Sequence, residues 1–127
     1  MKKRPTALEL KVLHRLWDID HAATVNEVIQ GWAEQISPAY TTVLKVLQNM
    51  EGKGFVNHER SGRAYRYTAL LRREELSRTR IQELLYGFFK GDTIGLVNAL
   101  VEEVDLSPEE IKEMRKMLAA KTKEKQT

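Results

Sequence analysis

The chain has 127 residues, the length of one domain or of a small domain with an appendage. Apolar residues make up 42% of it, and no apolar run approaches the ~18 residues of a transmembrane helix. The basic segment Met1 to Pro5 is not followed by the apolar stretch of a signal peptide, so we expect a cytoplasmic protein. Because there is no cysteine, disulfide scaffolds, thiolate zinc sites and cysteine nucleophiles are excluded.

The charge is unevenly distributed along the chain. Residues 1–70 contain ten Lys and Arg against seven Asp and Glu, whereas residues 71–127 contain eleven of each kind. The whole formal excess of +3 therefore lies in the N-terminal half. A basic half joined to a neutral half suggests a polyanion-binding part and a second part with another role. A slightly basic globular protein is the alternative interpretation.

Two helices are predicted at the N-terminus. Thr6 to Glu9 has the form of a capping box, and apolar residues then recur at helical spacing to about Asp18. Thr24 to Glu27 repeats this box before a short second helix, which we expect to fray near Gln35.

A third helix is predicted to follow, with Ser37 as its cap and Pro38 in its first position. It ends at Gly52 or Gly54, which suit a left-handed C-terminal cap. Its apolar face carries Val43, Val46, Leu47 and Met50.

A hairpin is predicted after the third helix, because two β-prone runs, 55–60 and 63–68, flank the turn dipeptide Ser61-Gly62. Three helices followed by a hairpin is the element order of a winged helix-turn-helix. The fold class is therefore mainly α with a small β-hairpin wing, and we assign residues 1–70 to a winged-helix DNA-binding domain.

Residues 71–127 show helical patterns only, and we assign them to a helical dimerisation domain. One helix is expected from Glu74 to about Lys90, a second after the break at Gly91, and a third after the capping box at 107–110. About 57 residues are too few for a self-sufficient core, so burial between two copies is the preferred interpretation. The alternative is packing against the N-terminal domain. The expected dimer interface comprises Leu84, Leu85, Phe88, Phe89, Leu96, Val97, Leu100, Val101, Ile111, Met114 and Leu118.

The third helix is the candidate for DNA recognition, since its polar side chains can bond base edges and phosphates in the major groove. Its N-terminus adds backbone donors for a phosphate. The other interpretation is an ordinary solvated face, which the neighbouring helix and hairpin make less attractive. The predicted DNA-contacting residues of this helix are Ala39, Tyr40, Thr41, Thr42, Lys45 and Gln48.

The hairpin tip adds Arg60, Arg63 and Arg66, which can straddle a DNA backbone or enter a narrow minor groove. Arg66 is the weakest of the three, because strand alternation directs it away from Tyr65 and Tyr67 and towards the helices. A solubilising turn is the alternative role for this tip.

No catalytic or metal-binding set can be assembled. His14, His21 and His58 are scattered without metal-ligand spacing, and there is no glycine-rich phosphate loop. We therefore expect neither an enzyme nor a cofactor. A winged helix that binds protein or RNA is the second functional hypothesis, since fold alone does not fix function.

The sequence resembles the penicillinase-repressor family, the BlaI/MecI type of winged-helix transcriptional regulator, over roughly residues 5 to 120. The resemblance rests on the order and spacing of several stretches taken together. These are Leu8-Glu9 to Leu16-Trp17, Tyr40 to Leu47, Lys53 to Val56, Gly62 to Tyr67, Phe89-Lys-Gly91, and Leu96 to Ser107.

The resemblance implies a homodimeric repressor on a palindromic operator, in a family that commonly controls β-lactam resistance operons. In those systems a membrane sensor-protease cuts the repressor within the dimerisation helices. The matching bond here is Ala99-Leu100, where the well-known resistance regulators carry an Asn-Phe pair. Copper-responsive relatives use a cysteine cluster, which this chain lacks.

Overall fold

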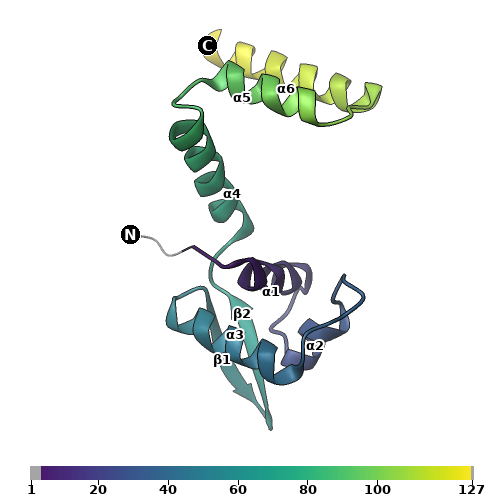
Figure 1. Cartoon of the computed structure of the whole chain (residues 1–127), viewed down its shortest axis with the longest axis vertical. Coiled ribbons are helices and arrows are strands. Elements are labelled where there is room, and N and C mark those ends of the chain that lie inside the picture. Colours follow the sequence, from purple (N-terminus) through teal and green to yellow (C-terminus); the bar gives the residue numbers. More distant parts are fainter. Residues whose placement is uncertain (1–3, 127) are drawn as a thin grey trace. The chain divides into compact units, whose positions relative to one another are not determined.

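The computed structural model describes residues 4–126, which form two compact units (Figure 1). The first unit extends to Thr79 and the second begins at Arg80. The boundary between these two units therefore lies within a helix, α4 (Arg73–Gln82).

The first unit has the element order of a winged helix-turn-helix, as predicted. Helices α1 (Ala7–Asp18), α2 (Val25–Gln30) and α3 (Tyr40–Gly52) precede strands β1 (Val56–Ser61) and β2 (Ala64–Ala69). The two strands pair antiparallel, and we call them and the turn between them the wing.

Capping boxes fix the starts of α1 and α2, and both were predicted. Thr6 and Glu9 exchange side-chain-to-backbone hydrogen bonds of 2.8 and 3.2 Å. Thr24 and Glu27 do the same at 2.9 and 3.2 Å. Each box satisfies two backbone N–H groups that a helix N-terminus otherwise leaves without partners.

Helix α2 ends at Gln30, so the prediction that it extends to about Gln35 was wrong. Gly31 closes the helix, and the Arg15 guanidinium lies over it so closely that a Cβ there would be 2.1 Å from Arg15 Cζ. A side chain at this position would require the flexible Arg15 guanidinium to move. Glycine is also a poor helix former, which agrees with the early end of α2.

Helix α3 begins at Tyr40 rather than at Pro38, so the predicted cap at Ser37 was also wrong. Ala39 is the N-cap residue, with extended backbone and no side-chain hydrogen bond to the helix. The local preference of Ser37-Pro38 for a helix start is therefore overridden, and the chain stays irregular for two more residues.

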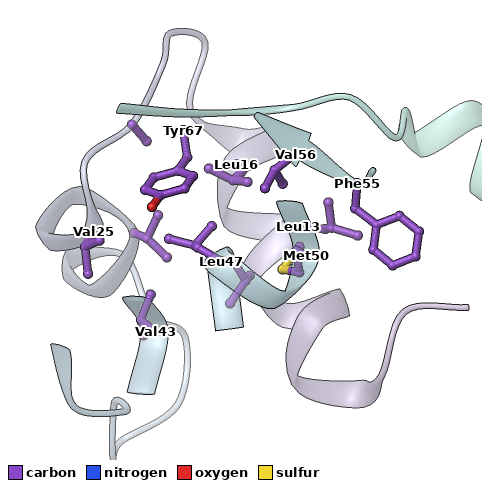
Figure 2. Close-up of a cluster of buried hydrophobic side chains, with 12 residues drawn as sticks. Leu13, Leu16, Val25, Val43, Leu47, Met50, Phe55, Val56 and Tyr67 are labelled. Atoms are coloured by element: carbon purple, nitrogen blue, oxygen red, sulfur yellow. The ribbon is translucent and has the colours of Figure 1, made fainter. Parts of the chain in front are cut away.

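The core of the first unit lies where the three helices meet the base of the wing (Figure 2). Leu13 and Leu47 come from α1 and α3 and are completely buried, and Tyr67 reaches the same cluster from β2. The inner face predicted for α3 is confirmed: Val43, Leu47 and Met50 are buried, and Val46 packs against them.

One buried ion pair joins the start of α1 to the end of α3. Lys53 Nζ lies 2.9 Å from both carboxylate oxygens of Glu9, which is almost fully buried. Burial alone would raise the pKa of Glu9, but the Thr6 backbone N–H and the Lys53 ammonium outweigh it, so this pKa is below its ordinary value.

The wing turns one residue later than predicted. Ser61 pairs with Ala64, so Gly62 and Arg63 form the two-residue loop. Gly62 has a φ of +64°, which favours glycine at the first loop position, as in a type II′ turn. The shift places Arg63 in the loop itself.

The second unit is entirely helical over its described residues. A π-helix, η1 (Glu83–Phe88), follows α4, and α5 (Thr93–Glu103) and α6 (Pro108–Gln126) come next. The predicted break at Gly91 is confirmed, since Gly91 has a φ of +85°. Asp92 caps α5, and Ser107 with Glu110 forms the predicted capping box of α6. Within residues 4–126, no helix is both long and apolar enough to cross a membrane.

Candidate nucleic-acid interface

The outer face of α3 presents polar side chains to solvent along its length. All six predicted positions of this face are exposed, while the opposite face forms the core. The six are Ala39, Tyr40, Thr41, Thr42, Lys45 and Gln48. This arrangement follows from helical spacing, because Val43, Leu47 and Met50 must turn inward.

The N-terminus of α3 differs from those of α1 and α2, because no side chain caps it. Its first backbone N–H groups point out of the helix beside the exposed Thr41 and Thr42. Uncapped amides and the positive end of the helix dipole favour an anion such as a phosphate.

The wing tip carries two exposed arginines. Arg63 lies in the turn, and within the described residues it has no hydrogen-bonding or ionic partner. Arg60 donates only to the Gly62 carbonyl, at 3.3 Å. Both guanidinium groups are thus available to a phosphate backbone.

Arg66 is not available in the same way, although the sequence groups it with the other two. It is half-buried, and its Nη1 donates to Glu27 Oε1 at 3.0 Å and to the Ala22 carbonyl at 3.2 Å. Arg66 is directed towards the helices, as strand alternation predicts, and contacts Glu27 of α2. The residue of β2 that enters the core is Tyr67.

A concavity of about 810 Å³ lies between α2, α3 and the wing. Tyr40, Gln48 and Arg63 line it together with two residues that sequence reasoning missed, Asn26 and Tyr65. Tyr65 is half exposed, and it lies two residues before buried Tyr67 on the same face of β2, which is the signal that could have indicated it. The concavity connects the exposed face of α3 to the wing tip.

The histidines make protein contacts of their own. His21 Nε2 lies 2.9 Å from Glu27 Oε2, His58 Nδ1 lies 2.5 Å from Glu51 Oε1, and His14 packs edge-on against Trp17. Among residues 4–126, no group of three or more His, Asp or Glu side chains could hold a metal ion.

Hydrogen bonding shifts the pKa values of His21 and Glu27 in opposite directions. Glu27 and then Asp20 raise the pKa of His21. The backbone N–H of Thr24 and then the His21 ring lower the pKa of Glu27 to about 2. The carboxylate of Glu27 is therefore ionised at neutral pH.

The second unit has a large apolar surface and no fully buried side chain among its described residues. Phe88 is 74% exposed and Leu100 is 54% exposed. Leu85, Phe89 and Leu96 are partly buried, and the other predicted interface residues are exposed. Those exposed residues are Leu84, Phe88, Val97, Leu100, Val101, Ile111, Met114 and Leu118.

The Ala99-Leu100 bond lies inside α5, which begins at Thr93 and ends at Glu103. Its backbone is hydrogen-bonded within the helix; for example, the Leu100 carbonyl accepts from the Val104 N–H at 3.2 Å.

Comparison with known proteins gives consistent matches. The family model described as penicillinase repressor matches residues 5–120. The penicillinase repressor of Bacillus licheniformis is 29% identical over 120 residues, which cover 93% of each chain. The methicillin resistance regulatory protein MecI of Staphylococcus aureus is 24% identical over 116 residues, covering 91% of this chain and 94% of the relative.

A solved structure also matches. The DNA-binding domain of the repressor BlaI is 28% identical, with a TM-score of 0.49, over 59% of this chain and 93% of that domain. Because the family model extends over nearly the whole chain, the resemblance seen in the sequence is confirmed: the chain belongs to the penicillinase repressor family of winged-helix, DNA-binding transcriptional repressors.

Proposed function

We propose that this chain is a homodimeric repressor that inserts α3 into the major groove of an inverted-repeat operator. The observation that carries the proposal is the uncapped, polar outer face of α3 beside the unpaired arginine of the wing tip. In a winged helix these two features contact one duplex together, one in a groove and one on the adjoining backbone.

The residue roles follow from their chemistry. Thr41, Thr42 and Gln48 offer hydrogen bonds and methyl contacts to base edges, and Gln48 suits adenine. Lys45 can reach guanine or a phosphate, while Arg60 and Arg63 contact the backbone. The half-exposed hydroxyls of Tyr40 and Tyr65 line the concavity between these sites and can bond the phosphates that cross it.

Dimerisation through the second unit supports this function. Apolar side chains that no core buries are stabilised when two copies pack together, at roughly 25 cal/mol per Å² removed from water. A two-fold dimer presents two α3 helices to two half-sites.

The family resemblance alone suggests a membrane sensor-protease as a partner class. A protease needs an extended substrate strand, so cleavage of Ala99-Leu100 requires local unfolding of α5. The leucine here in place of the phenylalanine of the resistance regulators favours relief of repression by another route.

Selection of bound sequences from random duplex DNA tests the function. The full chain is mixed with the pool and competitor DNA at near-physiological salt, since non-specific binding depends strongly on salt. We expect an inverted repeat to be enriched. If a folded dimer enriches no motif, the winged helix binds protein or RNA instead, and the proposal is wrong.

A further inference from the structure

A single carboxylate, that of Glu27, joins three parts of the first unit. Its Oε1 accepts from the Thr24 backbone N–H at 2.9 Å and from Arg66 Nη1 at 3.0 Å. Its Oε2 contacts His21 Nε2 at 2.9 Å. The cap of α2, the loop before α2 and the strand β2 therefore meet at one side chain.

The contacts of β2 with this loop lie close together along the strand. Arg66 Nη1 also donates to the Ala22 carbonyl at 3.2 Å. The adjacent residue, Tyr67, exchanges two backbone hydrogen bonds with Ala23, of 2.8 and 2.9 Å. The base of the wing is thus attached to the loop before α2 by backbone hydrogen bonds and by the Arg66 guanidinium.

Helix α2 is itself held against the rest of the unit. Arg15 donates to the carbonyls of Glu27 and Val28 at 3.1 and 3.0 Å, and Val28 is completely buried in the core that α3 shares. The backbone of Glu27 is therefore fixed relative to α3, and its carboxylate extends that constraint to the wing.

Few other contacts hold the wing. Within the described residues, His58 of β1 contacts Glu51 of α3, with His58 Nδ1 2.5 Å from Glu51 Oε1. Residues 57–63 are all exposed, and only Tyr67 and Val56 of its two strands are buried. The direction in which Arg63 projects depends on how the base of the wing is oriented, because a two-stranded hairpin is weakly stable by itself.

We propose that Glu27 is a positioning residue for DNA binding, which acts through Arg66 to hold the wing so that Arg63 meets the DNA backbone while α3 occupies the groove. The inference rests on the proposed function. It replaces the direct DNA contact that the sequence predicts for Arg66 by a role within the protein.

A double-mutant cycle on the full chain tests this role, with the duplex recovered by selection as the probe. Glu27→Gln keeps an oxygen to accept from Thr24 but removes the charge that holds Arg66. In the native chain, Arg63→Ala should reduce the slope of log K against log salt by about 0.9, the loss of one phosphate contact. In the Glu27→Gln background, the slope should already be reduced, and Arg63→Ala should lower it little further.

Thr41→Ala provides the matched control, because its place on α3 does not depend on the wing. It should cause the same fold-loss of affinity in both backgrounds. Equal effects of Arg63→Ala in both backgrounds would show that Glu27 has only a structural role, and would overturn the proposal.

Arg66→Met removes the other partner of the Glu27–Arg66 ion pair and leaves the capping box of α2 intact. It should reproduce the coupling seen with Glu27→Gln, which keeps the test decisive if that first variant fails to fold. If Arg66 instead contacts DNA, Arg66→Met would weaken binding additively with Arg63→Ala, and Glu27→Gln would not imitate it. Failure of the native chain to bind any duplex would count against the proposed function itself.

Discussion

Thr41 and Arg63 differ in what each can offer to DNA. Thr41 projects from the first turn of α3, where a hydroxyl and a methyl can distinguish one base from another. Arg63 lies in the wing turn, where a guanidinium meets any phosphate equally well. We therefore expect Thr41 to provide specificity and Arg63 to provide affinity.

Thr41→Ala should weaken binding to the selected operator more than binding to an unrelated duplex. If a base contact is lost, the difference between the two binding free energies should shrink by about 1 to 3 kcal/mol. Arg63→Ala should weaken both about equally. Fluorescence anisotropy with the two duplexes measures each. A change in the preferred sequence on Arg63→Ala would contradict the assignment of the wing to the backbone.

His21 gives the first unit a pH-dependent contribution to stability. Glu27 on α2 and Asp20 in the loop face its ring, and the Arg66 guanidinium shares the Glu27 carboxylate. Because the folded pKa of His21 is raised, protonated His21 stabilises the fold. That contribution is fully present below the unfolded pKa of about 6.5 and is lost as the pH rises through the folded pKa.

His21→Gln should therefore lower the free energy of unfolding more at about pH 5.5 than at about pH 9. Urea unfolding of both proteins at the two pH values measures the difference, and His14→Gln, which removes a histidine without a carboxylate partner, is the control. A His21→Gln effect that does not change with pH would show that the ring acts only by its hydrogen bond.

At the level of elements, the sequence predicts what depends on local periodicity. The caps at Thr6 and Thr24 and the inward face of α3 all follow from spacing of a few residues. The exposed outer face of α3 was predictable for the same reason, since it is the complement of that inward face. The role of Arg66 was not, because Glu27 is remote in sequence and only the folded chain brings them together.

Element boundaries depended on contacts that the sequence does not display. The Arg15 guanidinium packs over Gly31 at the end of α2, for example. The π-helix after Gln82 was not predicted either, since its hydrogen bonds, such as Phe89 N–H to the Leu84 carbonyl at 3.1 Å, skip one residue more than those of an α-helix. Periodicity alone does not separate the two over six residues.

Helix α5 carries an apolar stripe that we assign to the dimer interface. Val97, Leu100, Val101 and Val104 recur at three- and four-residue spacing and are exposed. Leu100→Asp should give monomers and weaken operator binding, because a carboxylate in an apolar interface is costly unless it finds a partner. Sedimentation velocity measures the association.

Asn98→Asp is the matched control, since it places the same charge at the edge of the stripe, about 160° around α5 from Leu100, and should weaken the dimer much less. Dimers of undiminished stability with Leu100→Asp would show that this stripe packs elsewhere, for example against the first unit.

At the scale of the whole molecule, the uneven charge and the two compact units suggest a division of labour. The positive excess lies within residues 1–70, which contain the uncapped α3 and the arginine tip. Most of the exposed large apolar side chains of the described residues belong to the second unit. Doubling the second unit would give one assembly with two DNA-contacting faces and hence a preference for inverted repeats.

The most direct test of this account is the stoichiometry and spacing dependence of binding to the selected duplex, measured by sedimentation velocity and anisotropy. We predict that two chains bind a duplex with two half-sites. Binding should be much weaker when the spacing between the half-sites is changed by about half a helical turn, because the half-sites then lie on opposite sides of the duplex. One chain per duplex, or affinity that is indifferent to the spacing, would contradict a two-fold repressor that presents two α3 helices to one operator.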